Sequence, residues 1–532
     1  MKRRTFLQQS TATITASGIL AACPQPSLIA ESLAPSQPSS LALQFAELSD
    51  HVLSQATGLG ASFAEFRIEQ SASESIHTRE KAVQSVNFSE DSGCCVRVLV
   101  DGAWGFAASH QISKAEVQKL IITAIAIAKQ QKGKRLHAVD LETLNAYQDT
   151  WQMPMQIDPF SIALEEKADR LLHINDLALN AGAKFCRSGL VQVREQKWLA
   201  NSVGSRIEQS RVRLRPYFSV TVLDPKKGGF ASRDSLAAPQ GTGYEYFKDY
   251  PFDQEIALAV EQAKEKLAAP GVKGAPLDLV IHPSNLWLTI HETIGHPTEL
   301  DRALGYEANF AGTSFVKPPL LDKLQYASDI VTVRADRTQA KGLSTIAYDD
   351  DGVKTSGKEF NIIDQGRFTN YQMALGQASL IGREHSNGCA YADSFSSFPL
   401  QRMPNISLQP GADEQITADS LIADVEDGIY IVGSGSWSID QQRYNFQFTG
   451  QTFHKIKNGK LAGMYKDVAY QGNSVEFWNA CDGLGGKGTY ELGGAFNCGK
   501  GRPTQSAPVS HGAVPARFRQ IQVLNTQAEA GA

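Results

Sequence analysis

The first 270 residues alternate between helical and strand-like hydrophobic patterns. Apolar residues at helical spacing predict helices over 41–57, 113–131, about 160–181 and about 253–268. Shorter apolar runs predict strands over 62–70 and 93–108 and strand-like pieces near 189–223. Ser113 is the expected N-cap of the second helix, with Glu116 at the capping-box position. Asp101-Gly102 is the expected hairpin turn within the second strand run.

Strand signals dominate after residue 271. The run 277–283 predicts a short buried strand, and 284–296 predicts a helix with Ser284 as its expected N-cap. Hairpin turns are expected at residues 364–366, which read Asp-Gln-Gly, and at Asn458-Gly459. The last 60 or so residues are rich in glycine and poor in helix formers.

These patterns predict an α+β fold with two domains. The first, over 41–270, combines a sheet with helices. The second, over 271–532, is mainly β and carries one decisive helix, 284–296. The pair Pro270-Gly271 ends the preceding helix and marks the expected boundary between them.

The N-terminus has the features of an export signal. Lys2, Arg3 and Arg4 precede a weakly apolar stretch over 11–22, which is too short to span a membrane. The arginine pair resembles a twin-arginine signal, and Leu-Ala-Ala-Cys ending at Cys23 resembles a lipoprotein cleavage site. We interpret 1–23 as the signal and the Pro/Ser-rich segment 24–40 as a tether. The protein is expected to be exported, periplasmic or membrane-anchored, with membrane contact only through a lipid on its N-terminus.

Composition indicates a globular protein and gives no support to nucleic-acid binding. The chain has 532 residues, of which 42% are hydrophobic and 20% charged, so it can bury sizeable cores. Its net charge of −5 and lack of a basic patch give no sign of nucleic-acid binding. Of its seven cysteines we expect most to be buried free thiols, with Cys498 as the exception.

The segment HETIGHPTELD, residues 291–301, places two histidines five residues apart. In a regular α-helix, residues five apart lie about 140° apart around the axis and cannot share one metal ion. Either a π-bulge restores a common face or the helix ends between the histidines. Gly295 would relax the backbone, and Pro297 disfavours the α conformation at His296. We therefore predict that the regular helix is bulged or broken at Gly295-His296.

The residues around this pair suit metal chemistry. Neutral imidazoles of His291 and His296 are good zinc ligands, and Glu292 is placed to take a proton from water, as in helical zinc proteases. A catalytic zinc needs a third protein ligand, for which Glu299 and a remote cysteine are both candidates. On spacing alone, two histidines near a helix end fit the pattern as well as a metal site does.

The chain resembles the TldD/PmbA family of bacterial metalloprotease-related proteins, on the motif-bearing TldD-like side. The resemblance rests on the His-Glu-x-x-x-His motif and on collinear segments spread from about 41 to 525. These segments are VRVLVDGAWGFAA (96–108), WLANSVG (198–204), YDDDGV (348–353), FPLQRMPNISLQPG (398–411) and CGKGRPTQSAPV (498–509). A proline at 297 departs from the glycine usual in the family.

The resemblance implies a set of roles and partners. His291, His296 and Cys498 are the implied ligands of Zn²⁺, and Glu299 is implied to orient a histidine. Family members form homodimers or heterodimers with a TldD/PmbA-type paralogue. They cleave unfolded peptides enclosed in the assembly, and binding of the peptide by strand addition is expected.

Several other residues allow two interpretations. Arg402 either binds a peptide backbone or carboxylate, or is structural and paired with an aspartate. The acidic run 349–351 lacks the alternation of a calcium loop, which favours a solvated turn. The isolated histidines are interpreted as structural or surface residues: His282, His385, His454 and His511.

The leading hypothesis is a zinc-dependent peptidase that hydrolyses unfolded peptides, with Glu292 as the general base. The alternative is a non-catalytic, peptide-binding partner subunit with a structural metal site. A surface-anchored peptide-binding lipoprotein without chemistry would explain the N-terminus but not the His-Glu pair.

Overall fold

The computed structural model describes residues 40–131, 134, 137–225 and 228–527. The predicted export signal, Cys23 and all but the last residue of the predicted tether lie outside the described residues. Among the described helices, none is long and apolar enough to cross a membrane.

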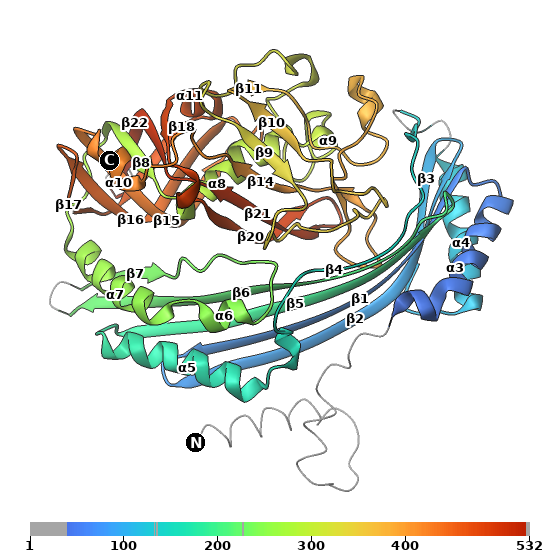
Figure 1. Ribbon diagram of the computed structural model, residues 1–532, viewed down its shortest axis with the longest axis horizontal. Helices are drawn as coiled ribbons and strands as arrows, with labels where there is room; N and C mark the ends of the chain where they lie inside the picture. Colours follow the sequence, from blue (N-terminus) through green and yellow to red (C-terminus); the bar gives the residue numbers. More distant parts are fainter. Residues whose placement is uncertain (1–39, 132–133, 135–136, 226–227, 528–532) are drawn as a thin grey trace, which may run out of the picture.

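The first half of the chain is built on a seven-stranded sheet with the order β3-β2-β1-β5-β6-β4, in which β7 also pairs with β6. Its strands are β1 (Phe63–Arg79), β2 (Ala82–Val100), β3 (Ala103–Ser109), β4 (Gln148–Gln152), β5 (Phe185–Asn201), β6 (Arg206–Asp224) and β7 (Gly229–Asp234). Neighbouring strands are antiparallel except β4 and β6. Figure 1 shows a long, strongly curved surface, with helices outside it and the second half of the chain inside the curve.

Alternation along the strands separates the two faces of this sheet. In β1, Phe66 and Ile68 point to the outer face and are completely buried under helices. The intervening Glu65, Arg67 and Glu69 point to the inner face. The helices of this half are α3 (Leu41–Gly58), α4 (Lys114–Gln130), α5 (Leu164–Asn180), α6 (Glu245–Asp249) and α7 (Phe252–Ala268). The apolar face thus forms one core with helices, while the charged face is left for the second half of the chain.

The second half contains a sheet that closes on itself. Its order is β15-β8-β22-β18-β16-β17, β19 also pairs with β22, and a further pairing of β15 with β16 completes a ring. The strands are β8 (Ala275–Ile281), β15 (Asp427–Ile439), β16 (Asn445–Lys457), β17 (Lys460–Tyr465), β18 (Val468–Asn473), β19 (Cys481–Leu484) and β22 (Ala516–Asn525). Aromatic rings, including Phe446, Tyr470, Phe477 and Trp478, fill its core.

Smaller sheets connect this ring to the inner face of the first sheet. One has the order β11-β10-β9-β14, and two others pair β12 with β13 and β20 with β21. Their bounds are β9 (Val333–Asp336), β10 (Phe360–Asp364), β11 (Arg367–Phe368), β12 (Ala390–Tyr391), β13 (Leu400–Gln401), β14 (Asn405–Leu408), β20 (Glu491–Lys500) and β21 (Gln505–Ala513). The helices of this half are α8 (Pro283–Ile290), α9 (Leu300–Ala303), α10 (Ala418–Ala423) and α11 (Ser474–Asn479).

The structure confirms the α+β class and most of the predicted elements. Ser113 caps α4 by accepting a hydrogen bond from the N–H of Glu116. The predicted turns at Asp101-Gly102, 364–366 and Asn458-Gly459 each join two antiparallel strands. The predicted cap of α8 is wrong. The helix begins at Pro283, and the side chain of His282 accepts a hydrogen bond from the N–H of Ser284.

The acidic run 349–351 is not a solvated turn, and this prediction is corrected. All three carboxylates are buried, and two of them pair with the first half of the chain. Asp350 accepts a hydrogen bond of 2.8 Å from the Nζ of Lys197, and Asp351 pairs with Arg97 at 2.7 Å. The run therefore holds the inner face of the first sheet against the second half of the chain.

Candidate metal centre

The helix that carries the two histidines changes its winding between them. Regular α-helix ends at Ile290, a π-helical turn covers His291–Gly295, and a short 3₁₀ turn follows over His296–Thr298. The N–H of His296 donates to the carbonyl of His291, five residues back. This winding places residues i and i+5 on one face, so the predicted irregularity is confirmed.

The predicted effect of Pro297 on the conformation of His296 is wrong. Gly295 and His296 both have right-handed helical dihedral angles, with φ of −56° and −63°. Gly295 also leaves room for Met403, because a Cβ there would lie 2.7 Å from the Met403 sulfur, which would have to shift. The altered winding frees some backbone carbonyls, and side chains from neighbouring segments satisfy them. Tyr326 and Gln372 donate hydrogen bonds to the carbonyl oxygens of Thr293 and Gly295.

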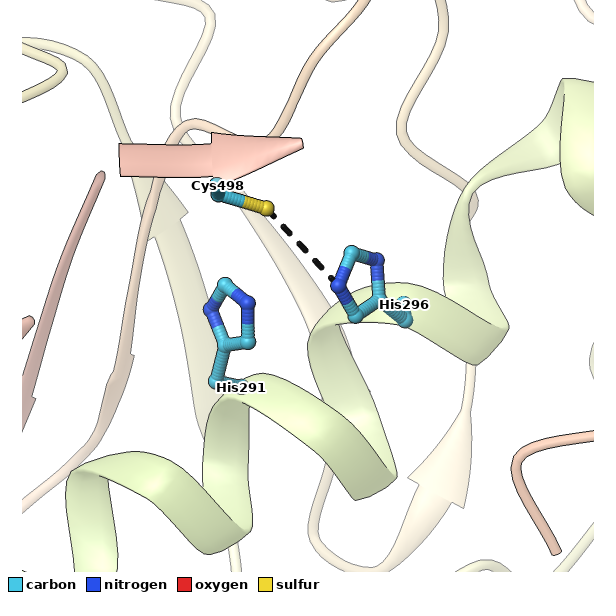
Figure 2. A group of neighbouring side chains, drawn as sticks. All are labelled: His291, His296 and Cys498. Atoms are coloured by element: carbon cyan, nitrogen blue, oxygen red, sulfur yellow. Dashed lines mark hydrogen bonds between the residues drawn. The ribbon is translucent and has the colours of Figure 1, made fainter. Parts of the chain in front are cut away.

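Three side chains converge above this turn (Figure 2). Ligand atoms of His291, His296 and Cys498 lie within 4.8 Å of one another, and all three residues are buried. The Sγ of Cys498 is 3.7 Å from the Nε2 of His296. Tetrahedral zinc with ordinary bond lengths separates a nitrogen and a sulfur ligand by about 3.6 Å. The donor set and its spacing therefore fit a zinc ion.

Cys498 reaches the histidines on the hairpin formed by β20 and β21. Arg402 holds both strands of this hairpin: its guanidinium donates to the carbonyl of Cys498 and, at 3.0 Å, to that of Gln505. Arg402 is almost completely buried and is structural, but its partners are carbonyls rather than the expected aspartate. Gly493 lets β20 pack on α8, because a Cβ there would overlap the ring of Trp287.

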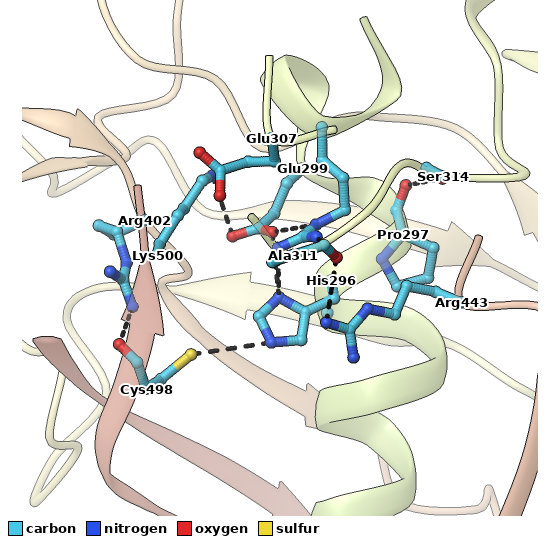
Figure 3. A network of polar contacts seen from close by, with 12 residues as sticks. His296, Pro297, Glu299, Glu307, Ala311, Ser314, Arg402, Arg443, Cys498 and Lys500 are labelled. Carbon is cyan, nitrogen blue, oxygen red and sulfur yellow. Dashed lines mark hydrogen bonds and ion pairs between the residues drawn. The ribbon is translucent and has the colours of Figure 1, made fainter. Parts of the chain in front are cut away.

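A charged network stands behind His296 (Figure 3). The Oε2 of Glu299 lies 3.0 Å from the Nδ1 of His296 and accepts a hydrogen bond of 2.8 Å from Arg302. Lys500 lies 3.2 Å from the other oxygen. Burial alone would raise the pKa of Glu299, but Lys500 and Arg302 hold that pKa well below 4.5. The ionised carboxylate accepts a hydrogen bond from the Nδ1–H of His296, which leaves Nε2 directed at Cys498.

The partner of His291 is His511, a residue that the sequence analysis set aside. The Nε2 of His511 lies 2.7 Å from the Nδ1 of His291, and its Nδ1 lies 3.0 Å from the carbonyl oxygen of Ile406. The two rings meet edge to face, with centroids 4.8 Å apart. No spacing rule connects a histidine on β21 to one on a helix 220 residues earlier.

Glu292 also has a partner that the sequence did not indicate. Arg443, in the loop between β15 and β16, forms an ion pair with its Oε2. The same guanidinium lies 3.4 Å from the carbonyl oxygen of Ala311. Glu292 follows the first histidine directly and is 5% exposed, so one arginine defines the position of a nearly buried carboxylate.

Burial sets the protonation of the three converging groups. It lowers the pKa of His291 and, more strongly, that of His296, so both imidazoles are neutral. Burial raises the pKa of the Cys498 thiol, which Arg402 partly offsets. A divalent cation beside a thiol reverses this effect, because coordination favours the thiolate.

Family models match most of the chain. The model for the PmbA/TldA metallopeptidase domain 1 matches residues 64–128, the model for the central domain matches 157–269, and that for the C-terminal domain matches 275–523.

Individual relatives cover nearly the same span. A metalloprotease of Methanothermobacter thermautotrophicus is 27% identical over 465 residues, which is 87% of this chain and 96% of the relative. A zinc metalloprotease TldD homolog of Saccharolobus solfataricus is 23% identical and covers 81% of this chain and 90% of its own length.

Two solved structures share the fold. A protein described as a modulator of a DNA gyrase from Thermotoga maritima has a TM-score of 0.71 at 14% identity, covering 90% of this chain and 100% of its own. TldE from Thermococcus kodakarensis has a TM-score of 0.64 at 15% identity, covering 89% and 99%. The domain matches cover well over half of the sequence, in order and with the metal-site helix inside the third. The chain therefore belongs to the PmbA/TldD family of metallopeptidases.

Proposed function

We propose that the protein is a zinc-dependent peptidase that hydrolyses unfolded peptides. The observation that carries the proposal is the convergence of two imidazoles and one thiol on a π-helical turn, with the carboxylate of Glu292 beside them. Zinc is favoured as the metal because neutral imidazoles and a thiolate are its usual ligands, and because one relative is named a zinc metalloprotease.

His291, His296 and Cys498 would hold the ion. When bound there, zinc supplies Lewis acidity, which polarises a carbonyl group and lowers the pKa of water. Glu299 is occupied by His296, Arg302 and Lys500, so it supports a ligand rather than adding a fourth. Three protein ligands are the number found in catalytic zinc sites, whereas structural sites usually have four.

Glu292 would move the proton in this reaction. Its carboxylate takes a proton from the attacking water and passes it to the leaving amine. Arg443 holds one oxygen of the carboxylate and so orients the other. Burial of the group excludes bulk water that would compete for the proton.

The substrate would be an extended peptide. A cavity of about 630 Å³ lies between the inner face of β5 and β6 and the strand β20, and Trp287 of α8 lines it. Within the described residues, β20 pairs with β21 along one edge only. A peptide added along the other edge of β20 would run toward Cys498, with its backbone groups paired as in a sheet.

Partners and location are also proposals. We propose that the chain acts as a homodimer or as a heterodimer with a TldD/PmbA-type paralogue. The twin-arginine-like residues and Cys23 support export and an N-terminal lipid anchor.

The test combines zinc analysis with peptide cleavage. Wild-type protein should contain one zinc per chain and cleave unfolded peptides. Glu292→Gln should keep the zinc and lose at least about 100-fold in cleavage rate, since general-base catalysis contributes that much or more. Glu384→Gln, which changes an exposed glutamate in the same way, is the matched control. His296→Ala should lose the zinc.

Full activity of Glu292→Gln would exclude the mechanism. Stoichiometric zinc with no cleavage in the wild type would instead support the non-catalytic subunit.

A further inference from the structure

His511 lies in the site but has no role in the reaction proposed above. It is completely buried on β21, and both of its ring nitrogens have a partner. One partner is a candidate ligand, His291, and the other is the carbonyl of Ile406 on β14. The directions of these two hydrogen bonds can be worked out, because one of the partners can only accept.

The proton positions follow from that carbonyl. Since the carbonyl oxygen of Ile406 accepts, the Nδ1 of His511 carries a proton. In a neutral imidazole the Nε2 is then bare, and it accepts a hydrogen bond from the Nδ1–H of His291. The Nε2 of His291 is therefore bare in turn. Its lone pair is the one left to bind an ion.

The two candidate histidine ligands are thus fixed by different chemistry. His296 donates to a carboxylate, Glu299, whose charge is balanced by Arg302 and Lys500. His291 donates to a neutral imidazole, which adds no negative charge to the site. A neutral acceptor fixes the tautomer of the ligand without weakening the Lewis acidity of an ion held by it.

The hairpin explains why this contact forms only together with the rest of the site. Within it, His511 is paired with Gly493 on β20, the strand that carries Cys498. Docking of one hairpin on α8 therefore delivers both the thiol and the acceptor for His291.

We propose that His511 is a positioning residue that holds His291 in its metal-binding tautomer by accepting a hydrogen bond from its Nδ1–H. This inference rests on the proposed function, since it takes His291 to be a ligand. The role depends on an acceptor at the position of Nε2, and not on an imidazole as such. A glutamine at 511 can place its side-chain oxygen near that position, whereas a leucine of similar volume cannot accept.

The experiment measures zinc affinity by competition with a chelator, in the full chain and without any peptide. His511→Leu should bind zinc about 10- to 100-fold more weakly than wild type, the usual effect of removing a partner of a metal-binding histidine. His511→Gln should stay within a few-fold of wild type. His454→Leu, at a half-buried histidine on β16 outside the site, should leave the affinity unchanged. Melting of the zinc-free proteins shows whether each variant folds.

Wild-type affinity in His511→Leu would overturn the inference. So would equal loss of zinc in folded His511→Leu and His511→Gln. If His511→Leu fails to fold, the result for His511→Gln decides, with retained zinc as support and lost zinc as refutation. Absence of zinc from the wild type would overturn the proposed function and this inference together.

Discussion

Glu292, the proposed general base, is held by Arg443, and the proposed reaction depends on the geometry of this ion pair as well as on its charge. Replacing Arg443 by methionine removes the group that holds the carboxylate, while the three converging ligands stay in place. We expect zinc content to remain at wild-type level and kcat to fall by about 100-fold, the size of effect that a misplacement of about 1 Å produces.

Arg367→Met, at an exposed arginine on β11, provides the comparison for loss of a positive charge. Unchanged kcat in Arg443→Met would show that Glu292 keeps its position without the arginine.

At the scale of single residues, the sequence indicated the three donors but not the groups behind them. His291 and His296 stand out by their motif, and Cys498 by its family resemblance. The structure brings these three together. His511 and Arg443 lie 220 and 151 residues from their partners in sequence. Contacts over such distances follow from the packing of β strands and leave no local pattern to read.

The π-helical turn is an element whose formation depends on packing outside the helix. Gly295→Ala places a Cβ against the sulfur of Met403, the far end of a flexible but buried side chain, so we expect the low end of the usual overpacking cost, about 1 kcal/mol. We expect Gly295→Ala to lower the free energy of unfolding by that amount in urea titrations. In a Met403→Ala background the same change should cost clearly less, because the overlap is gone.

Gly58→Ala is the matched control for this prediction, because a Cβ there meets nothing within 4 Å. Equal costs of Gly295→Ala in the two backgrounds would contradict the steric explanation.

Helices with a strong hydrophobic periodicity could be predicted from the sequence, whereas the residues at which they begin and end were harder to predict. The helices α3, α4, α5 and α7 follow the 3.6-residue pattern that predicted them. The cap of α8 was misplaced because His282, which rarely caps a helix, does so here ahead of a proline. The five-residue spacing predicted the bulge correctly, because it rests on helix geometry alone. The explanation by Pro297 was wrong, because His296 keeps a helical conformation ahead of the proline.

At the scale of the whole molecule, buried charges join the two halves. Lys197 on β5 donates to Asp350 at 2.8 Å and to the carbonyl of Ala392 at 2.7 Å. Lys197→Met leaves this aspartate buried without its partner, which costs about 3–5 kcal/mol. We expect a drop of that size in the free energy of unfolding.

Lys457→Met provides the comparison, because Lys457 pairs with Asp427 on the surface. Water screens an exposed pair of this kind, so its loss should cost far less than the loss of the buried pair. Similar losses in the two lysine variants would show that the inner-face charges do not stabilise the assembly of the two halves.

Glu69, on the same inner face, makes stability depend on pH. Burial raises the pKa of Glu69 from 4.5 to about 7, although Lys197 opposes the shift. The folded state therefore holds this proton more tightly than the unfolded state does. The stability that results is fully present below about pH 4.5 and is lost as the pH rises through about 7.

Glu69→Gln removes this titration. The difference in unfolding free energy between wild type and Glu69→Gln, measured by urea titration, should therefore change across that pH range. Parallel profiles for the two proteins would contradict the assignment.

The inner face also marks the limit of sequence reasoning about the whole fold. The alternation Glu65, Arg67, Glu69 predicts a strand, but nothing local shows what covers its charged side. The acidic run 349–351 has the composition of an exposed turn, and it is buried because its partners lie on strands far earlier in the chain. The fold class and most helices and strands could be predicted from the sequence. The contact between the inner face of the first sheet and the run 349–351 is visible only in the structure.

The hairpin of β20 and β21 also determines when the proposed metal site can be completed during synthesis. The helix with His291 leaves the ribosome 220 residues before His511 does. At roughly 5–20 residues per second, that interval is about 10 to 45 s. For most of it the two histidines of the helix lack both the Cys498 thiol and the His511 imidazole, and the imidazole arrives last. If the proposed zinc binds there, the complete site is available to it only after β21 has been synthesised.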